Sequence, residues 1–299
     1  MSKRIYTVLG ATGHIGQVIT EELLKKGHTV MALGRDPKKL TPLKEKGAHI
    51  MSPAFNDSTA LTEAFKGADG VFTMIPPSYG AEDFGVYQNQ TGEAIAQALK
   101  DSDVKHHLLL SSIGADKPAG TGPIANLYSQ EKRLEKISGL NNLFLRPSSF
   151  MENIFWAIPI IKGMGIYGSP MRADLPIPMV ATHDIGVKAA ELLDKLDFTG
   201  NTVFELGGPK AHTMKEVASI VGKAIGKPDL AYVQFPYEDA KKGMMGSGMN
   251  AKMADMMIEM NKAFNDGLVM PTQSLTGDHQ GHTSLEEFVK FVAGAYAQA

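Results

Sequence analysis

The 299-residue sequence contains no cysteine, a single tryptophan and almost no net charge. The absence of cysteine excludes disulfides, cysteine-ligated metal centres and a thiol nucleophile. The 30 Lys and Arg residues nearly balance the 32 Asp and Glu residues, which argues against a strongly basic nucleic-acid-binding protein. No run approaches the roughly 20 apolar residues of a membrane span. The first residues lack the apolar segment of a signal peptide, so we expect a cytoplasmic protein with no membrane partner and no direct nucleic-acid partner.

Short β-rich runs alternate with segments of helical spacing over the first 150 residues. Nearly continuous apolar strands between helices are typical of a parallel sheet that is covered on both faces. The sequence therefore predicts an α/β fold with a doubly wound, Rossmann-type parallel sheet. The expected strands are 5–9, 28–33, 49–51, 70–75, 107–110 and 143–145. Helices are expected at 14–26, 37–46, 83–100 and 124–138, and a further one after Asp57 and Ser58 carries Leu61, Ala64 and Phe65.

The regular alternation weakens after Pro147, where several prolines and glycines interrupt it. Helices are still expected at about 183–196 and 213–225, and a strand at 202–206, with His183 and Asp184 capping the first of these helices. We expect an NADP(H)-binding domain over residues 1–150. Residues 151–299 are expected to form a smaller, mostly helical substrate or lid lobe that is interwoven with the first domain.

A glycine-rich turn joins the first strand to the first helix. In such a turn Gly10 permits the tight change of direction, Gly13 lets the backbone approach a pyrophosphate, and Gly16 lets the helix pack closely on the strand. The free N–H groups of the helix N-terminus then favour phosphate. The expected cofactor-binding residues of this turn are Gly10, Thr12, Gly13, His14, Ile15 and Gly16.

The residues after the second strand bear on the choice of nucleotide. Arg35 stands close to the position at which an NAD-binding protein carries an acidic residue for the ribose 2′-OH, and Lys38 and Lys39 follow one turn later. A guanidinium matches the geometry of a 2′-phosphate. We therefore expect NADP(H) to be preferred over NAD(H), with Arg35 and Lys39 as contacts. Asp36 leaves the alternative that its carboxylate accepts from a 2′-OH.

Two further strand ends should border the cofactor, because parallel α/β sheets bind ligands at the carboxyl ends of their strands. Asp57 follows the third strand, where we expect the adenine edge, and it can also cap the next helix. The fourth strand is followed by residues expected under the ribose and pyrophosphate, namely Met74, Ile75 and Pro76.

Six segments in order resemble the NmrA-like branch of the atypical short-chain dehydrogenases. They are GATGHIG (10–16), GRDP (34–37), LLLSSIGAD (108–116), LRPSSFMEN (145–153), PMVATHDIG (178–186) and FELGGPKAHTMKEVA (204–218). The resemblance covers residues 4 to about 226 and implies a doubly wound fold that binds NADP(H). Some members of that family reduce quinones, azo dyes or triphenylmethane dyes. Others bind the nucleotide without known catalysis and act on protein partners.

The resemblance directs attention to Tyr128 and Lys132, which have the Tyr-x-x-x-Lys spacing of short-chain dehydrogenases. Residues four apart lie on one helix face. The lysine can bind the nicotinamide ribose and lower the pKa of the phenol, so that the tyrosine delivers a proton as hydride moves. The alternative for Tyr128 is a packing role. A second match, at Tyr237 and Lys241, lies away from the helix on which the family carries its lysine.

The sequence departs from the family pattern at one position. Relatives that transfer a proton carry there a serine or threonine hydroxyl, which orients the substrate carbonyl. Ser111 and Ser112 are close to that position and are expected beside the cofactor, but Ile113 aligns with the hydroxyl itself.

After the sixth strand, Phe150 and Asn153 are the expected substrate contacts. Arg146 should pair with a carboxylate of the scaffold.

Methionines cluster between residues 244 and 260, and four of them share one helix face (Met253, Met256, Met257 and Met260). They can line a lid over flat ligands or pack the helix on the core. Methionine without histidine or cysteine is a poor ligand set, so we expect no metal. The two histidines of residues 278–282 are expected in a polar loop, and a loop that faces the substrate is the alternative.

Two hypotheses on function follow. The first is an NADPH-dependent oxidoreductase that transfers hydride to a small conjugated acceptor, such as a quinone or an azo dye. The second is a non-catalytic NADP(H)-binding redox sensor that acts through a protein partner. A reductase of sugar nucleotides or flavonoids is a weaker alternative, because the orienting hydroxyl is missing.

Overall fold

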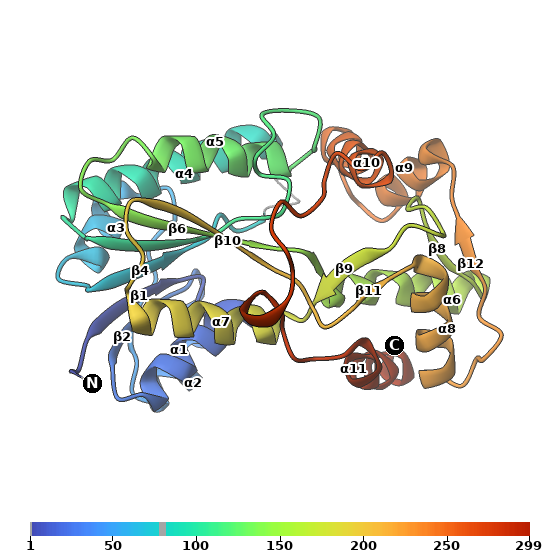
Figure 1. Cartoon of the computed structure of the whole chain (residues 1–299), viewed down its shortest axis with the longest axis horizontal. Coiled ribbons are helices and arrows are strands. Elements are labelled where there is room, and N and C mark those ends of the chain that lie inside the picture. Colours follow the sequence, from blue (N-terminus) through green and yellow to red (C-terminus); the bar gives the residue numbers. More distant parts are fainter. Residues whose placement is uncertain (1, 78–81) are drawn as a thin grey trace.

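The computed structural model describes residues 2–77 and 82–299. Its centre is a parallel seven-stranded sheet in the order β10-β6-β5-β4-β1-β2-β3 (Figure 1). The order reverses between β1 and β4, which creates the switch point at which such sheets bind ligands. The predicted doubly wound α/β fold is confirmed. The strands are β1 (Ile5–Leu9), β2 (Thr29–Leu33), β3 (His49–Met51), β4 (Gly70–Thr73), β5 (His106–Leu110), β6 (Asn141–Pro147) and β10 (Asn201–Leu206).

Helices cover both faces of the sheet (Figure 1). On one face α1 (His14–Lys25), α2 (Pro37–Glu45) and α7 (Thr182–Lys195) bury apolar side chains against β1 and β2, for example Ile19 and Leu193 against Tyr6 and Val8. On the other face α3 (Ser58–Phe65), α4 (Phe84–Asp101) and α5 (Ile124–Leu134) enclose a second core. This arrangement leaves the carboxyl ends of the strands as the open edge on which a ligand can lie.

The chain returns to the first sheet after residue 150, through β10 and α7. Strand β10 pairs with β6, with Glu205 level with Arg146. The second lobe has its own core, to which Ile154, Val217 and Phe288 contribute. Its elements are β7 (Ser149–Phe150), η1 (Met151–Ala157), α6 (Ile158–Met164), β8 (Tyr167–Ser169), β9 (Ile177–Val180), β11 (Ala211–His212), α8 (Met214–Ala224), β12 (Tyr232–Gln234), α9 (Tyr237–Gly246), α10 (Ala251–Asn265) and α11 (Leu285–Gln298). A short turn, η2 (Gly277–His279), precedes α11.

Helix capping confirms one expectation and corrects another. Asp57 caps α3 as predicted, since its carboxylate accepts from the backbone N–H of Ala60 at 3.0 Å. The prediction that His183 and Asp184 cap α7 is wrong. Instead Glu152 accepts from the backbone N–H of Thr182 at 3.0 Å, at the first residue of the helix. Asp184 is free to bind elsewhere and accepts from Thr283, far along the chain.

Within residues 2–77 and 82–299, no helix has both the length and the apolar character that crossing a bilayer requires.

Candidate functional site

The glycine turn has the backbone shape that a dinucleotide requires. Gly10 adopts a φ of +78°, a conformation that favours glycine. A Cβ on Gly16 would lie 2.3 Å from the carbonyl oxygen of Gly10, so only glycine lets α1 start this close to β1. Gly13 precedes the first turn of α1, where no side chain caps the free N–H groups, and it is exposed together with His14. The turn therefore fits a phosphate group.

The same turn touches the end of β2. The backbone N–H of Ala11 donates to the carbonyl of Leu33 at 2.9 Å. A Cβ on Gly34 would lie 2.9 Å from the Cγ2 of Thr12, so Thr12 packs where β2 ends. Ile15 is buried in the core and can offer a ligand only its backbone.

Of the charged residues after β2, one caps a helix and three are exposed cations. The carboxylate of Asp36 accepts from the backbone N–H of Lys38 at 2.9 Å and so caps α2. Arg35, Lys38 and Lys39 are exposed, and none of them forms an ion pair with another part of the described chain. The cations at this edge are thus available to an anion, whereas Asp36 is engaged by its own helix.

The ends of β3 and β4 complete this side of the site. Asp57 faces the first turn of α3. A Cβ on Gly10 would lie 3.1 Å from the Sδ of Met74, so Met74 packs directly against the glycine turn. Ile75 and Pro76, which follow it, are buried.

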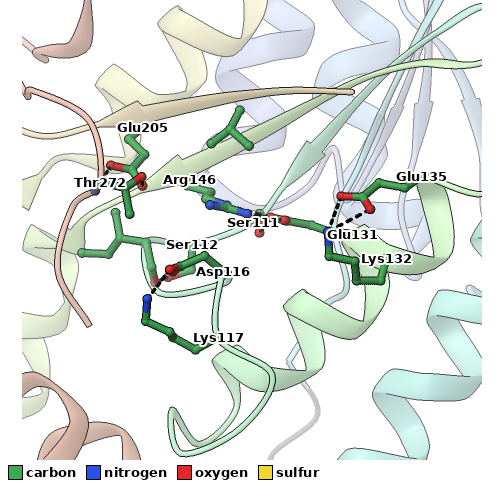
Figure 2. Close-up of polar contacts among 12 residues, drawn as sticks. Ser111, Ser112, Asp116, Lys117, Glu131, Lys132, Glu135, Arg146, Glu205 and Thr272 are labelled. Carbon is green, nitrogen blue, oxygen red and sulfur yellow. Dashed lines mark hydrogen bonds and ion pairs between the residues drawn. The ribbon is translucent and has the colours of Figure 1, made fainter. Parts of the chain in front are cut away.

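A buried ion pair lies beneath the ends of β5 and β6 (Figure 2). The Nε of Arg146 lies 2.9 Å from one carboxylate oxygen of Glu131, and its Nη2 lies 2.5 Å from the other. Ser111 donates its Oγ proton to Glu131 at 2.5 Å. Burial acts to lower the pKa of Arg146, but the hydrogen bonds and charge of Glu131 raise it overall. This pair confirms the expectation that Arg146 binds a scaffold carboxylate.

Tyr128 and Lys132 lie on a flank of α5 beside this pair. Successive helical residues are rotated by about 100°, so Lys132 points away from the direction of Glu131. Its Nζ lies 2.8 Å from both carboxylate oxygens of Glu135 and 5.7 Å from the ring centre of Tyr128 (Figure 2). The hydrogen bonds to Glu135 raise the pKa of the Lys132 ammonium. Tyr128 is half-buried. The roles of both residues stay predictions.

The turn after β5 is apolar where an orienting hydroxyl would lie. Ser112 donates to the adjacent carbonyl of Ile113 at 2.9 Å. Ile113 is buried in a small cluster with Ile124, and Leu127 packs against it. The structure thus gives Ser111 and Ser112 partners within the protein.

Phe150 and Asn153 have different surroundings. Phe150 is half-buried and packs against the sheet core, whereas Asn153 is exposed on η1. Their contact with a substrate stays a prediction.

Helix α10 carries the methionine stripe and lies on the loop that precedes α5. A Cβ on Gly122 would lie 2.1 Å from the carbonyl oxygen of Met256, and Met260 packs against the cluster around Ile113. Met253 is buried, so part of the stripe packs inside the protein. In the described residues no group of three or more His, Asp or Glu side chains is arranged to hold a metal.

Two acidic residues of this region were missed by sequence reasoning. Glu131 precedes Lys132 on the helix and belongs to no motif of the sequence, and Glu205 lies inside a largely apolar strand. The only available signal was the need of Arg146 for a carboxylate, which does not identify the partner. The histidine loop expected at 278–282 is docked on β10, since the ring of His279 stacks on Phe204 with centroids 4.2 Å apart.

Several known proteins are similar to this chain in sequence or in fold. The NAD(P)H azoreductase of Xenophilus azovorans is 28% identical over 298 residues, which cover 98% of this chain and 99% of the relative. The NADPH-dependent quinone oxidoreductase of Escherichia coli, solved with NADPH, superposes with a TM-score of 0.80 at 22% identity, over 96% of this chain and 99% of that one. NmrA, a negative transcriptional regulator solved with NADP, superposes with a TM-score of 0.75 at 16% identity, over 100% and 98% of the two chains. The model of the NmrA-like family matches residues 1–289. This chain belongs to the NmrA-like family.

Proposed function

We propose that this protein is an NADPH-dependent oxidoreductase that transfers hydride to a small conjugated acceptor, such as a quinone or an azo dye. The observation that carries the proposal is the glycine turn between β1 and α1, at the switch point of the sheet, with exposed cations one strand away. The name of the azoreductase relative, which matches nearly the whole chain, supports the same reaction class.

The preference for NADP(H) over NAD(H) rests on Arg35. Its guanidinium and the ammonium of Lys39 are exposed beside the glycine turn, where they can bind a 2′-phosphate. Asp36, the residue that would favour a 2′-OH, already caps α2. Charge and capping therefore favour the phosphorylated nucleotide.

The other expected contacts follow the strand ends in order. Asp57 is proposed beside the adenine, Met74, Ile75 and Pro76 beside the ribose and pyrophosphate, and Ser111, Ser112 and Lys132 beside the nicotinamide ribose. The nicotinamide supplies the hydride when it is bound. Lys132 would have to exchange Glu135 for the ribose, which a single exposed side chain can do by changing its rotamer.

On the acceptor side, Phe150 and Asn153 are the proposed contacts. Tyr128 is the proposed proton donor, and water can supply the proton to a conjugated acceptor if the tyrosine only packs. We also propose a cytoplasmic location and a division at residue 150 between nucleotide domain and substrate lobe.

A second candidate function is that of an NADP(H)-binding sensor with a protein partner. It is favoured by the likeness in fold to a regulator solved with NADP, and by the buried apolar side chain of Ile113 at the place where a hydroxyl would orient an acceptor. A sensor needs the nucleotide site but no acceptor site.

Oxidation of NADPH by the purified protein, followed against a panel of quinones, azo dyes and simple carbonyls with NADH in parallel, tests the proposal. We expect turnover with a conjugated acceptor and a faster rate with NADPH. Tight binding of NADPH without turnover would favour the sensor. A Tyr128→Phe variant that retains the full rate would assign that tyrosine to packing.

A further inference from the structure

The segment between α10 and α11, residues 266–284, covers the free edge of the sheet, and we call it the strap (Figure 1). Strand β10 is the last in the sheet order, so its outward backbone groups need partners. The side chain of Gln273 accepts from the N–H of Glu205 at 2.9 Å and donates to the carbonyl of Val203 at 3.0 Å. The N–H of Gly207 donates to the carbonyl of His279 at 2.9 Å.

Glu205 adds a carboxylate to this attachment, and all of its hydrogen bonds go to the strap. The side chain is fully buried. It accepts from the N–H and the hydroxyl of Thr272 at 2.7 and 2.8 Å (Figure 2). It also accepts from the N–H of Gln273 at 2.8 Å. Arg146 is level with it on β6 but is paired with Glu131. The buried carboxylate therefore depends on Thr272 and Gln273 for its hydrogen bonds.

The start of the strap lies against the turn that follows β5. Three residues before Thr272, the buried Val269 has both Cγ atoms 3.0 Å from the point that a Cβ of Gly114 would occupy. It packs in the cluster of Ile113, to which Met260 of α10 also contributes. The contacts of Glu205 thus fix the end of α10 next to the carboxyl end of β5.

We propose that Glu205 is a positioning residue for the acceptor: through Thr272 and Gln273 it holds Val269 and α10 against the turn after β5, and so sets the wall on which the acceptor binds. The inference rests on the proposed function, because the acceptor is expected at the ends of β5 and β6. Loosening the strap should spare the binding of the nucleotide phosphates, since the glycine turn lies at the end of β1, which three strands separate from β10 in the sheet order.

Two variants test this. Glu205→Leu removes both carboxylate oxygens and the three hydrogen bonds that they accept, and Thr272→Val removes one hydroxyl and leaves the backbone intact. We expect the KM for the acceptor to rise on the order of tenfold in Glu205→Leu and about threefold in Thr272→Val, because one hydrogen bond corresponds to roughly this factor. The Kd for NADPH should stay within about twofold of the unmodified protein, which a general loss of structure would not allow.

The matched control is Asp184→Asn. Asp184 accepts from the N–H and the hydroxyl of Thr283 at 2.7 and 2.9 Å, so it anchors the other end of the strap, next to α11. This variant should lower stability without changing the acceptor KM. An equal rise in KM in Asp184→Asn, or an unchanged KM in Glu205→Leu, would overturn the proposal.

Hydrogen exchange separates this proposal from the proposed function and from a folding defect. In Thr272→Val, amides of residues 256–273 should exchange faster than in the unmodified protein, whereas those of β1 and α1 should not change. This result would support the positioning role even if no acceptor is turned over. Faster exchange restricted to residues 271–276, with α10 unchanged, would overturn it.

Discussion

Glu131 and Arg146 form a two-pronged ion pair beneath the ends of β5 and β6, and both side chains are buried. The pair fixes the rotation of α5, because one carboxylate binds a strand residue and the hydroxyl of Ser111 together. The orientation of Tyr128 and Lys132 on that helix follows from it.

Removing Arg146 alone should lower the free energy of unfolding more than removing both Arg146 and Glu131. Arg146→Met leaves Glu131 buried without its cation and should lower the free energy of unfolding by about 3–5 kcal/mol. The double variant Glu131→Leu/Arg146→Met should lose less than Arg146→Met alone. Urea unfolding of the two variants measures the difference. Losses that simply add would contradict the account.

Gly16 should not tolerate a methyl group. In Gly16→Ala the new Cβ would lie 2.3 Å from the Gly10 carbonyl oxygen, so the turn must shift. We expect a loss of about 1–3 kcal/mol in stability and a large loss of NADPH affinity. The control is Gly243→Ala in α9, where nothing lies within 4 Å and stability should rise slightly. Calorimetry and NADPH titration provide the comparison, and similar behaviour of the two variants would refute the role given to Gly16.

Arg35→Ser should weaken the binding of NADPH much more than the binding of NADH. Loss of the guanidinium removes a charge-assisted contact to a 2′-phosphate, so NADPH should bind about 10- to 100-fold more weakly, with little change for NADH. Lys44→Ser, which removes an exposed cation from the last turn of α2, is the control. Titration of each variant with both nucleotides measures the effect. An equal loss for NADPH and NADH would remove the basis of the NADP(H) preference.

The stability of the protein should fall in mild acid because of His107. Its ring is buried between Thr73 and Asn142, and burial lowers its pKa to about 4. Since the pKa is near 6.5 in the unfolded chain, the unfolded state binds more protons between these values. The neutral His107 ring therefore does not lower the free energy of unfolding above pH 6.5. As the pH falls from 6.5 toward 4, the free energy of unfolding decreases by up to roughly 3 kcal/mol.

Unfolding free energies measured between pH 7 and 4.5 check this sign. In His107→Leu, the dependence on pH should weaken by about one proton over this interval. A variant whose pH dependence matches that of the unmodified protein would show that His107 does not titrate as described.

The sheet could be predicted because its signals are local. Each strand and helix is marked by its own apolar period, and Asp57 caps the helix that follows it directly. Local signals do not predict which side of α5 packs against the sheet. Tyr-x-x-x-Lys spacing is met by Tyr128 and Lys132 whichever side of the helix meets the sheet, and the Glu131–Arg146 pair decides the side. Likewise Asp184 and Glu205 bind partners 99 and 67 residues away, which no local pattern reveals.

We propose that the protein transfers a hydride from bound NADPH. The most direct test is single-turnover oxidation of NADPH that carries deuterium on one or the other face of nicotinamide C4, with a quinone or an azo dye as acceptor. The account predicts that one of the two labels slows both NADPH oxidation and acceptor reduction severalfold, while the other has almost no effect. Tight NADPH binding with no acceptor reduction and no effect of either label would contradict it.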